Sequence, residues 1–151
     1  MRTLTKFAAL ALLLVAITAG CKRTVDDNRE AIQTAETAIE NAQYDQALDI
    51  CESLVKENAG DSLLSANDYC RIALAMKKIS DATDNGDITA SAVNCYRSAE
   101  ALSGDSIMSF LWSLQPADAS IFLNIMLIAS SQGATFGDSV EGIDTIPADS
   151  I

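Results

Sequence analysis

The chain has 151 residues, a formal net charge of −11 and no histidine, and hydrophobic residues make up 49 % of it. An acidic chain repels the phosphate backbone of nucleic acids, so the charge argues against a nucleic-acid partner. The lack of histidine removes the commonest general base and the commonest metal ligand, which argues against an enzyme and against a metal site. No cofactor is indicated, and the length suits one domain.

The first twenty residues have the layout of an export signal. Arg2 and Lys6 stand near the start without any acidic residue, residues 7–17 form an unbroken apolar run, and small residues occupy positions 18–20. The run is shorter than the about 20 apolar residues that a membrane-spanning helix needs. We therefore expect residues 1–20 to be a secretory signal peptide.

The end of this segment, Ile17-Thr18-Ala19-Gly20-Cys21, resembles the lipobox of bacterial lipoproteins. The resemblance implies that the signal peptide is cut before Cys21 and that its thiol carries a diacylglyceryl anchor. Thr18 departs from the Leu, Val or Ile that is usual there, and the alternative is an ordinary cleaved signal with an incidental cysteine. Because each buried methylene contributes about 0.8 kcal/mol, several acyl chains together would hold the protein firmly on a membrane.

The residues after Cys21 bear on which membrane this is. In the lipoprotein class an aspartate directly after the cysteine favours the inner membrane, and Lys22 stands there instead. The resemblance therefore implies a lipid-anchored protein of the cell envelope, on the outer membrane rather than the inner one and facing the periplasm. Surface display through Asp26 and Asp27 is an alternative, although both follow two cations. We assign residues 21–30 to the anchor and a short linker.

The rest of the chain predicts an all-α fold. Apolar residues recur at spacings of three and four, which indicates helices with one buried face, and residues 24–27 predict a capping box before the first. Six helices joined by short connections should fold back as antiparallel pairs, either as a repeat-like array or as a compact bundle. We place this helical domain at 31–132, with helices near 32–42, 44–56, 69–79, 88–102, 107–114 and 117–131.

Two further expectations concern how these helices are connected and packed. The pairs Gly60-Asp61, Gly86-Asp87 and Gly104-Asp105 predict connections in which glycine ends one helix and aspartate caps the next. Residues 121–129, "IFLNIMLIA", are apolar on almost every side. We expect the sixth helix, whose first turn contains Pro116, to be the buried helix that closes the fold.

The middle of the chain resembles a tetratricopeptide repeat, although in degenerate form. In "NAQYDQALDICESLVKEN", Tyr44, Ala47 and Cys51 match the aromatic, alanine and apolar positions of the second repeat helix, and Ile88 and Cys95 repeat the pattern. The first helix lacks the usual large aromatic and Leu-Gly pair, and the spacing is longer than the family period of about 34 residues. A plain helical bundle is the alternative.

Three cysteines fall on predicted helices. Cys51, Cys70 and Cys95 suit buried apolar thiols, and a disulfide between two of them is the alternative in an oxidising compartment. They lack CxxC spacing and a fourth ligand, so they do not predict a metal site. The acidic segment 81–87 fails the calcium-loop pattern because position twelve is alanine, and a capped turn explains it better.

Residues 133–151 lack helical periodicity and any basic residue, and we expect a disordered acidic tail. The tail contains three triplets of aspartate, a hydroxyl residue and an aliphatic residue. These resemble the acceptor motif of a general O-glycosylation system of some Gram-negative anaerobes. The resemblance implies glycans on Ser139, Thr145 and Ser150, whereas the similar triplets at Asp61 and Asp105 suit helix caps.

Two functions from different classes fit this pattern. The repeat resemblance implies a non-catalytic adaptor that holds an envelope protein against the first helix of each pair. The alternative for this charged helix face is that it only contacts solvent. The alternative is a small ligand-binding or structural accessory lipoprotein of an uptake system, with a closed apolar cavity beneath Phe110, Trp112, Phe122 and Met126. The exposed residues expected on the adaptor face are Gln33, Glu36, Thr37, Glu40, Asp68, Arg71, Lys77 and Lys78.

Overall fold

The computed structural model describes residues 23–60 and 63–133, and within these ranges the chain is helical without strands. The all-α expectation is confirmed. The predicted lipidation site Cys21, the glycosylation candidates Ser139, Thr145 and Ser150, and the acidic tail after Gly133 lie outside the described residues. The helices are α2 (Val25–Glu40), α3 (Tyr44–Glu57), α4 (Ala66–Thr83), α5 (Gly86–Leu102), α6 (Gly104–Ser113) and α7 (Pro116–Gly133).

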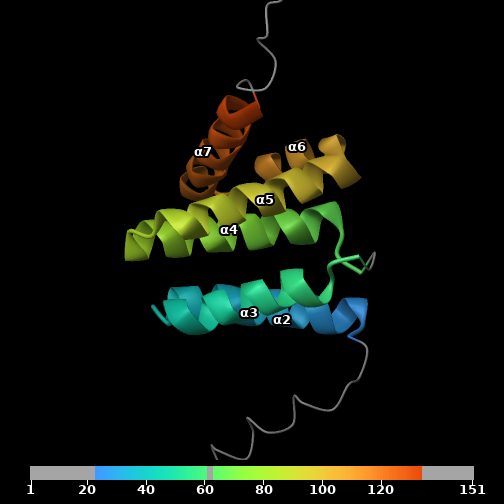
Figure 1. Ribbon diagram of the computed structural model, residues 1–151, viewed down its shortest axis with the longest axis vertical. Helices are drawn as coiled ribbons and strands as arrows, with labels where there is room; N and C mark the ends of the chain where they lie inside the picture. The colour runs from blue at the N-terminus through green and yellow to red at the C-terminus, as the bar shows by residue number, and fades with distance from the viewer. Residues whose placement is uncertain (1–22, 61–62, 134–151) are drawn as a thin grey trace, which may run out of the picture.

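The first four described helices form two antiparallel pairs that stack on one another (Figure 1). α2 and α3 make one pair, α4 and α5 make the next, and α6 and α7 cover the far side of α4 and α5. α2, α4 and α6 run in the same direction, and α7 crosses the others at a steep angle. α4 contacts every other described helix, and eleven of its 18 residues are buried. The core of the described domain is therefore centred on α4.

The prediction that the sixth helix is the buried one was wrong. α7 buries only one face, with Phe122, Ile125 and Ala129, whereas Leu123 and Leu127 are 50 % and 66 % exposed. The helix lies at the edge of the stack, where neighbouring helices cover one side only. The sequence did not predict that α4 is the most buried helix, because small and charged residues make up much of it. Alanines allow the close approach of neighbours on several sides, which a hydropathy pattern does not report.

Capping boxes start two of the described helices. Thr24 and Asp27 form the predicted capping box of α2: the Asp27 amide donates to Thr24 Oγ1 at 3.2 Å, and the Thr24 amide donates to Asp27 Oδ2 at 2.8 Å. Ser65 and Asp68 form the same arrangement before α4. Because α2 begins at Val25, residues 25–30, which the sequence placed in a linker, are helical.

The glycine-aspartate connections differ from expectation. Gly86 and Gly104 are the first residues of α5 and α6, and the N-caps are Asn85 and Ser103 before them. The prediction that Asp87 and Asp105 are the N-caps was therefore wrong. Both aspartates lie in the first helical turn, where the helix dipole favours a carboxylate. Of the three glycines, Gly60 has a left-handed backbone, with φ of +95°.

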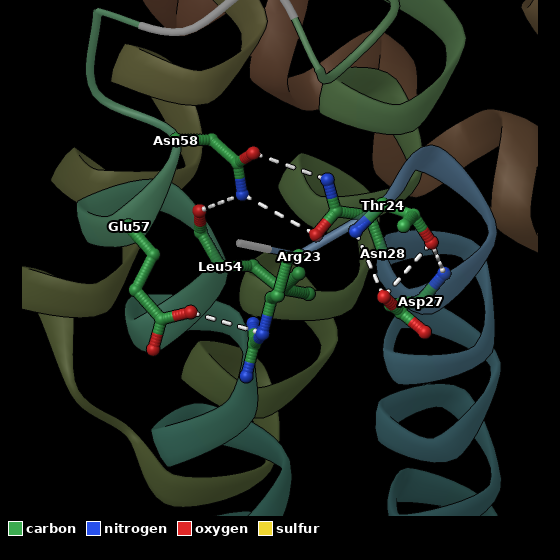
Figure 2. Close-up of polar contacts among 7 residues, drawn as sticks. All are labelled: Arg23, Thr24, Asp27, Asn28, Leu54, Glu57 and Asn58. Atoms are coloured by element: carbon green, nitrogen blue, oxygen red, sulfur yellow. Dashed lines mark hydrogen bonds and ion pairs between the residues drawn. The ribbon is translucent and has the colours of Figure 1, made fainter. Parts of the chain in front are cut away.

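A buried pair of asparagines joins the start of α2 to the end of α3 (Figure 2). Asn28 Nδ2 donates to Asn58 Oδ1 at 3.1 Å, and Asn58 Nδ2 donates to Asn28 Oδ1 at 3.4 Å and to the Leu54 carbonyl at 2.8 Å. Both amides are fully or nearly fully buried. Beside them, Arg23 Nε lies 2.9 Å from Glu57 Oε2. Since a buried amide needs its partners, this pair fixes how α2 and α3 align.

We expect Asn28→Leu to lower the free energy of unfolding by about 1–3 kcal/mol, because it removes the buried partner of the Asn58 side chain. Urea unfolding followed by circular dichroism would measure the loss. In the double variant Asn28→Leu, Asn58→Leu no buried amide is left unpaired, so the loss should be smaller than the sum of the two single losses. Additive losses would show that the two amides are not coupled.

Candidate functional site

A groove of about 540 Å³ crosses the face formed by α2, α4 and α6. Its volume lies in the range of binding pockets in proteins. Its apolar lining comes from three helices and includes Ile39, Leu74, Ala75, Phe110 and Leu114. Its polar lining consists of Glu36, Glu40, Asn67, Arg71, Lys78, Ser113 and Asp118.

Two ion pairs tie the helices together along this groove. The Arg71 guanidinium donates from Nε to Glu36 Oε1 at 2.9 Å and from Nη2 to Glu36 Oε2 at 2.6 Å, which joins α4 to α2. The hydrogen bonds to Glu36 raise the pKa of Arg71. Lys78 Nζ lies 2.7 Å from Asp118 Oδ1 and joins α4 to the start of α7. Both cations of the groove are therefore already paired with carboxylates of the same chain.

The groove continues along α6 into a second hollow of about 410 Å³. The two share Asn67, Phe110 and Ser113, and the second adds Asp105, Ser106 and Ser109. Ser106 lies in the first turn of α6, and its amide donates to Oγ of the N-cap residue Ser103 at 3.3 Å. The combined surface has an apolar stretch beside α2 and a hydroxyl-rich stretch beside the start of α6. This is a shape suited to an elongated occupant.

The structure brings together half of the residues expected on the adaptor face, namely Glu36, Glu40, Arg71 and Lys78. Sequence reasoning missed the apolar part of the groove and Asp118. The stripe at 107–114 predicted α6 but not that Phe110 and Leu114 border open space. Asp118 could have been suspected only from its place in the first turn of α7, where a carboxylate is favourable.

The other half of the expected residues lie elsewhere. Gln33 and Thr37 line a separate hollow between α2 and α3, of about 450 Å³. Asp68 is 3 % exposed, and its carboxylate accepts from Ser65 in the cap of α4. Lys77 is buried and pairs with Asp81 on the same helix. These positions serve local structure because the helical period turns them away from the groove.

The closed cavity expected beneath the aromatic residues is not formed by them. Phe110 and Phe122 pack edge to face with ring centroids 5.0 Å apart, and Tyr96 packs against Phe122 at 6.0 Å. Trp112 is 80 % exposed, so it encloses nothing. Of the four predicted residues, Phe110 and Phe122 are therefore in direct contact, and Met126 lines a hollow beside Tyr96 and Ala129.

Cys51, Cys70 and Cys95 are free thiols in the described core, each at most 3 % exposed. Burial raises the pKa of each to about 12. Cys95 Sγ lies 3.9 Å from Met76 Sδ, a weak contact between apolar side chains. A thiol in this environment holds its proton and packs as a small hydrophobe rather than acting as a nucleophile.

Among residues 23–60 and 63–133, no group of three or more cysteines and carboxylates is placed to hold a metal ion. None of the described helices combines the length and the apolar character that crossing a membrane requires. The groove combines an apolar lining with polar residues at its edges, as binding surfaces of proteins do. The chain matches no family model, no curated protein and no solved structure.

Proposed function

We propose that the protein is a lipid-anchored, non-catalytic adaptor of the bacterial cell envelope, and that the groove between α2, α4 and α6 docks a segment of another envelope protein. The observation that carries the proposal is the groove itself, an open apolar channel with charged edges, built from α2 and α4, which are the first helices of the two antiparallel pairs, and from α6. Docking surfaces of proteins combine such an apolar centre with a polar rim.

The ion pairs beside the groove support this role. Arg71 reaches Glu36 across 35 positions of sequence, and Lys78 reaches Asp118 across forty. These contacts link α4 to α2 and to the start of α7 in the free protein, and all four residues line the groove. A preformed surface loses less conformational entropy on binding, which leaves more of the contact energy as affinity.

The proposed anchor would lie close to the first helix pair. Cys21 stands two residues before Arg23 in the sequence, and the Arg23 guanidinium pairs with Glu57 at the end of α3. Lipid on Cys21 would hold the domain at the outer membrane, on the periplasmic side, within reach of other envelope proteins. A small-ligand accessory role has less support, since the groove is open and the aromatic residues expected around a cavity pack on each other.

The test is photo-crosslinking in intact envelopes. Asn67 is exposed and lines both hollows of the groove, so Asn67→p-benzoylphenylalanine places the crosslinker where the two hollows meet. Asp49 is exposed on α3 and lines neither hollow, so the same replacement there is the control. We expect one discrete adduct from position 67, none from position 49, and less adduct in a Cys21→Ala background. Equal adducts from both positions, or none from position 67, would refute the proposal.

A further inference from the structure

The charges along the groove bear on the chemistry of its occupant, and the inference rests on the proposed docking function. The cations Arg71 and Lys78 are each held by a carboxylate of the chain itself. Glu40 and Asp105 differ, because neither carboxylate makes a hydrogen bond or ion pair with a described residue. The charge that remains available to a partner is therefore negative.

The two available carboxylates lie toward opposite ends of the groove. α2, α4 and α6 run in the same direction (Figure 1). Glu40 is the last residue of α2, and Asp105 is in the first turn of α6. The α4 residues that line the groove extend from Asn67 to Lys78, a length of roughly 16 Å at 1.5 Å per residue. The apolar side chains of Ile39, Leu74, Phe110 and Leu114 lie along this length.

From this arrangement we propose that the groove binds a basic amphipathic protein segment, with lysine or arginine toward each end and apolar side chains between them. An apolar or acidic occupant would remove water from the carboxylates of Glu40 and Asp105 without supplying a hydrogen-bond donor or a positive charge in its place. Desolvating an unpaired carboxylate in this way costs free energy. A basic occupant pairs with both and buries its apolar face on the lining. The net charge of −11 would also speed its approach at low salt.

The test uses two labelled peptides of about 12 residues, long enough as a helix to span the groove. Both carry the same leucines at helical spacing, and one has lysine at its ends where the other has glutamate. Binding to the full chain is followed by fluorescence anisotropy. We expect the lysine peptide to bind at least about tenfold more tightly, and its affinity to fall as salt rises.

A matched pair of variants separates the groove from general attraction. The double variant Glu40→Gln, Asp105→Asn removes two charges from the groove. We expect it to lower the affinity for the lysine peptide about tenfold. Asp45→Asn with Asp49→Asn removes two charges from the exposed side of α3, outside both hollows. This control should change binding by less than about twofold, as distant exposed charges are screened. Equal weakening by both variants would overturn the inference.

The crosslinker at position 67 distinguishes the two proposals. If it captures both peptides equally, or an envelope partner whose binding does not depend on Glu40 and Asp105, the occupant is not selected by charge, and docking in the groove still stands. If position 67 captures neither peptide and no envelope protein, both proposals fail.

Discussion

Phe122→Ala should lower the free energy of unfolding by about 3–5 kcal/mol, the range found when a large buried aromatic is truncated. Phe122 is fully buried, and its ring meets Tyr96 of α5 and Phe110 of α6 edge to face. Through these ring contacts Phe122 joins α7 to α5 and α6. Its loss leaves a cavity at the junction of three helices, which can collapse only partly.

Leu127→Ala is the matched control on the same helix. Leu127 is 66 % exposed, so its truncation should change the free energy of unfolding by less than about 0.5 kcal/mol. Urea unfolding followed by far-ultraviolet circular dichroism measures both variants. Similar losses for the two would mean that α7 is covered on both faces in solution, contrary to the exposure seen in the structure.

Raising the pH above 9 should destabilise the protein by several kcal/mol through its buried thiols. Burial raises the pKa of Cys51, Cys70 and Cys95 from 9.0 to about 12. Between these values the unfolded chain releases protons that the folded chain retains, so the stability that is complete below pH 9 is lost as the pH rises toward 12. For each thiol the difference between the two pKa values corresponds to about 4 kcal/mol, which is fully lost only near pH 12.

The measurement is the free energy of unfolding in urea between pH 8 and pH 10. Burial also raises the pKa of Tyr69 and Tyr96 above 10.0, so the unfolded chain begins to lose their protons toward pH 10, and this contribution is common to the wild type and the cysteine variant. The triple variant with alanine at the three cysteines should start less stable and show a flatter pH dependence. A wild-type profile as flat as that of the variant would show that the thiols titrate normally and are not buried.

The burial of the three thiols also predicts that they are alkylated slowly in the folded protein. Alkylation by iodoacetamide needs the thiolate, and a pKa of about 12 leaves roughly one thiol in ten thousand ionised at pH 8. We expect Cys51, Cys70 and Cys95 to react at the normal rate only after urea is added. Rapid labelling of the native protein would contradict the closed core around α4.

Much of the fold was accessible from the sequence because its determinants are local. The recurrence of Ile32 and Ala35 marks one face of α2, and both are buried in the structure. The capping box at Thr24 needs only residues three positions apart. The wrong predictions for the starts of α5 and α6 have a local cause too. The side chains of Asn85 and Ser103 cap these helices, so each helix begins at the glycine that was expected to end the preceding one.

The candidate site was predictable only in part. Helical spacing was enough to place Glu36, Glu40, Arg71 and Lys78 on outward-facing surfaces of α2 and α4. It could not reveal that Glu36 meets Arg71, because that contact depends on how the two helices align.

The sequence by itself determined that the described domain is all-α, because a period of 3.6 residues and a cap at a helix start are encoded in neighbouring residues. Only the tertiary structure decided that α4 rather than α7 is central, and that Glu40 and Asp105 are left unpaired beside an apolar groove. Both outcomes depend on which helix faces meet. Leu127 and Phe122 are equally apolar in the sequence, but neighbouring helices cover only Phe122.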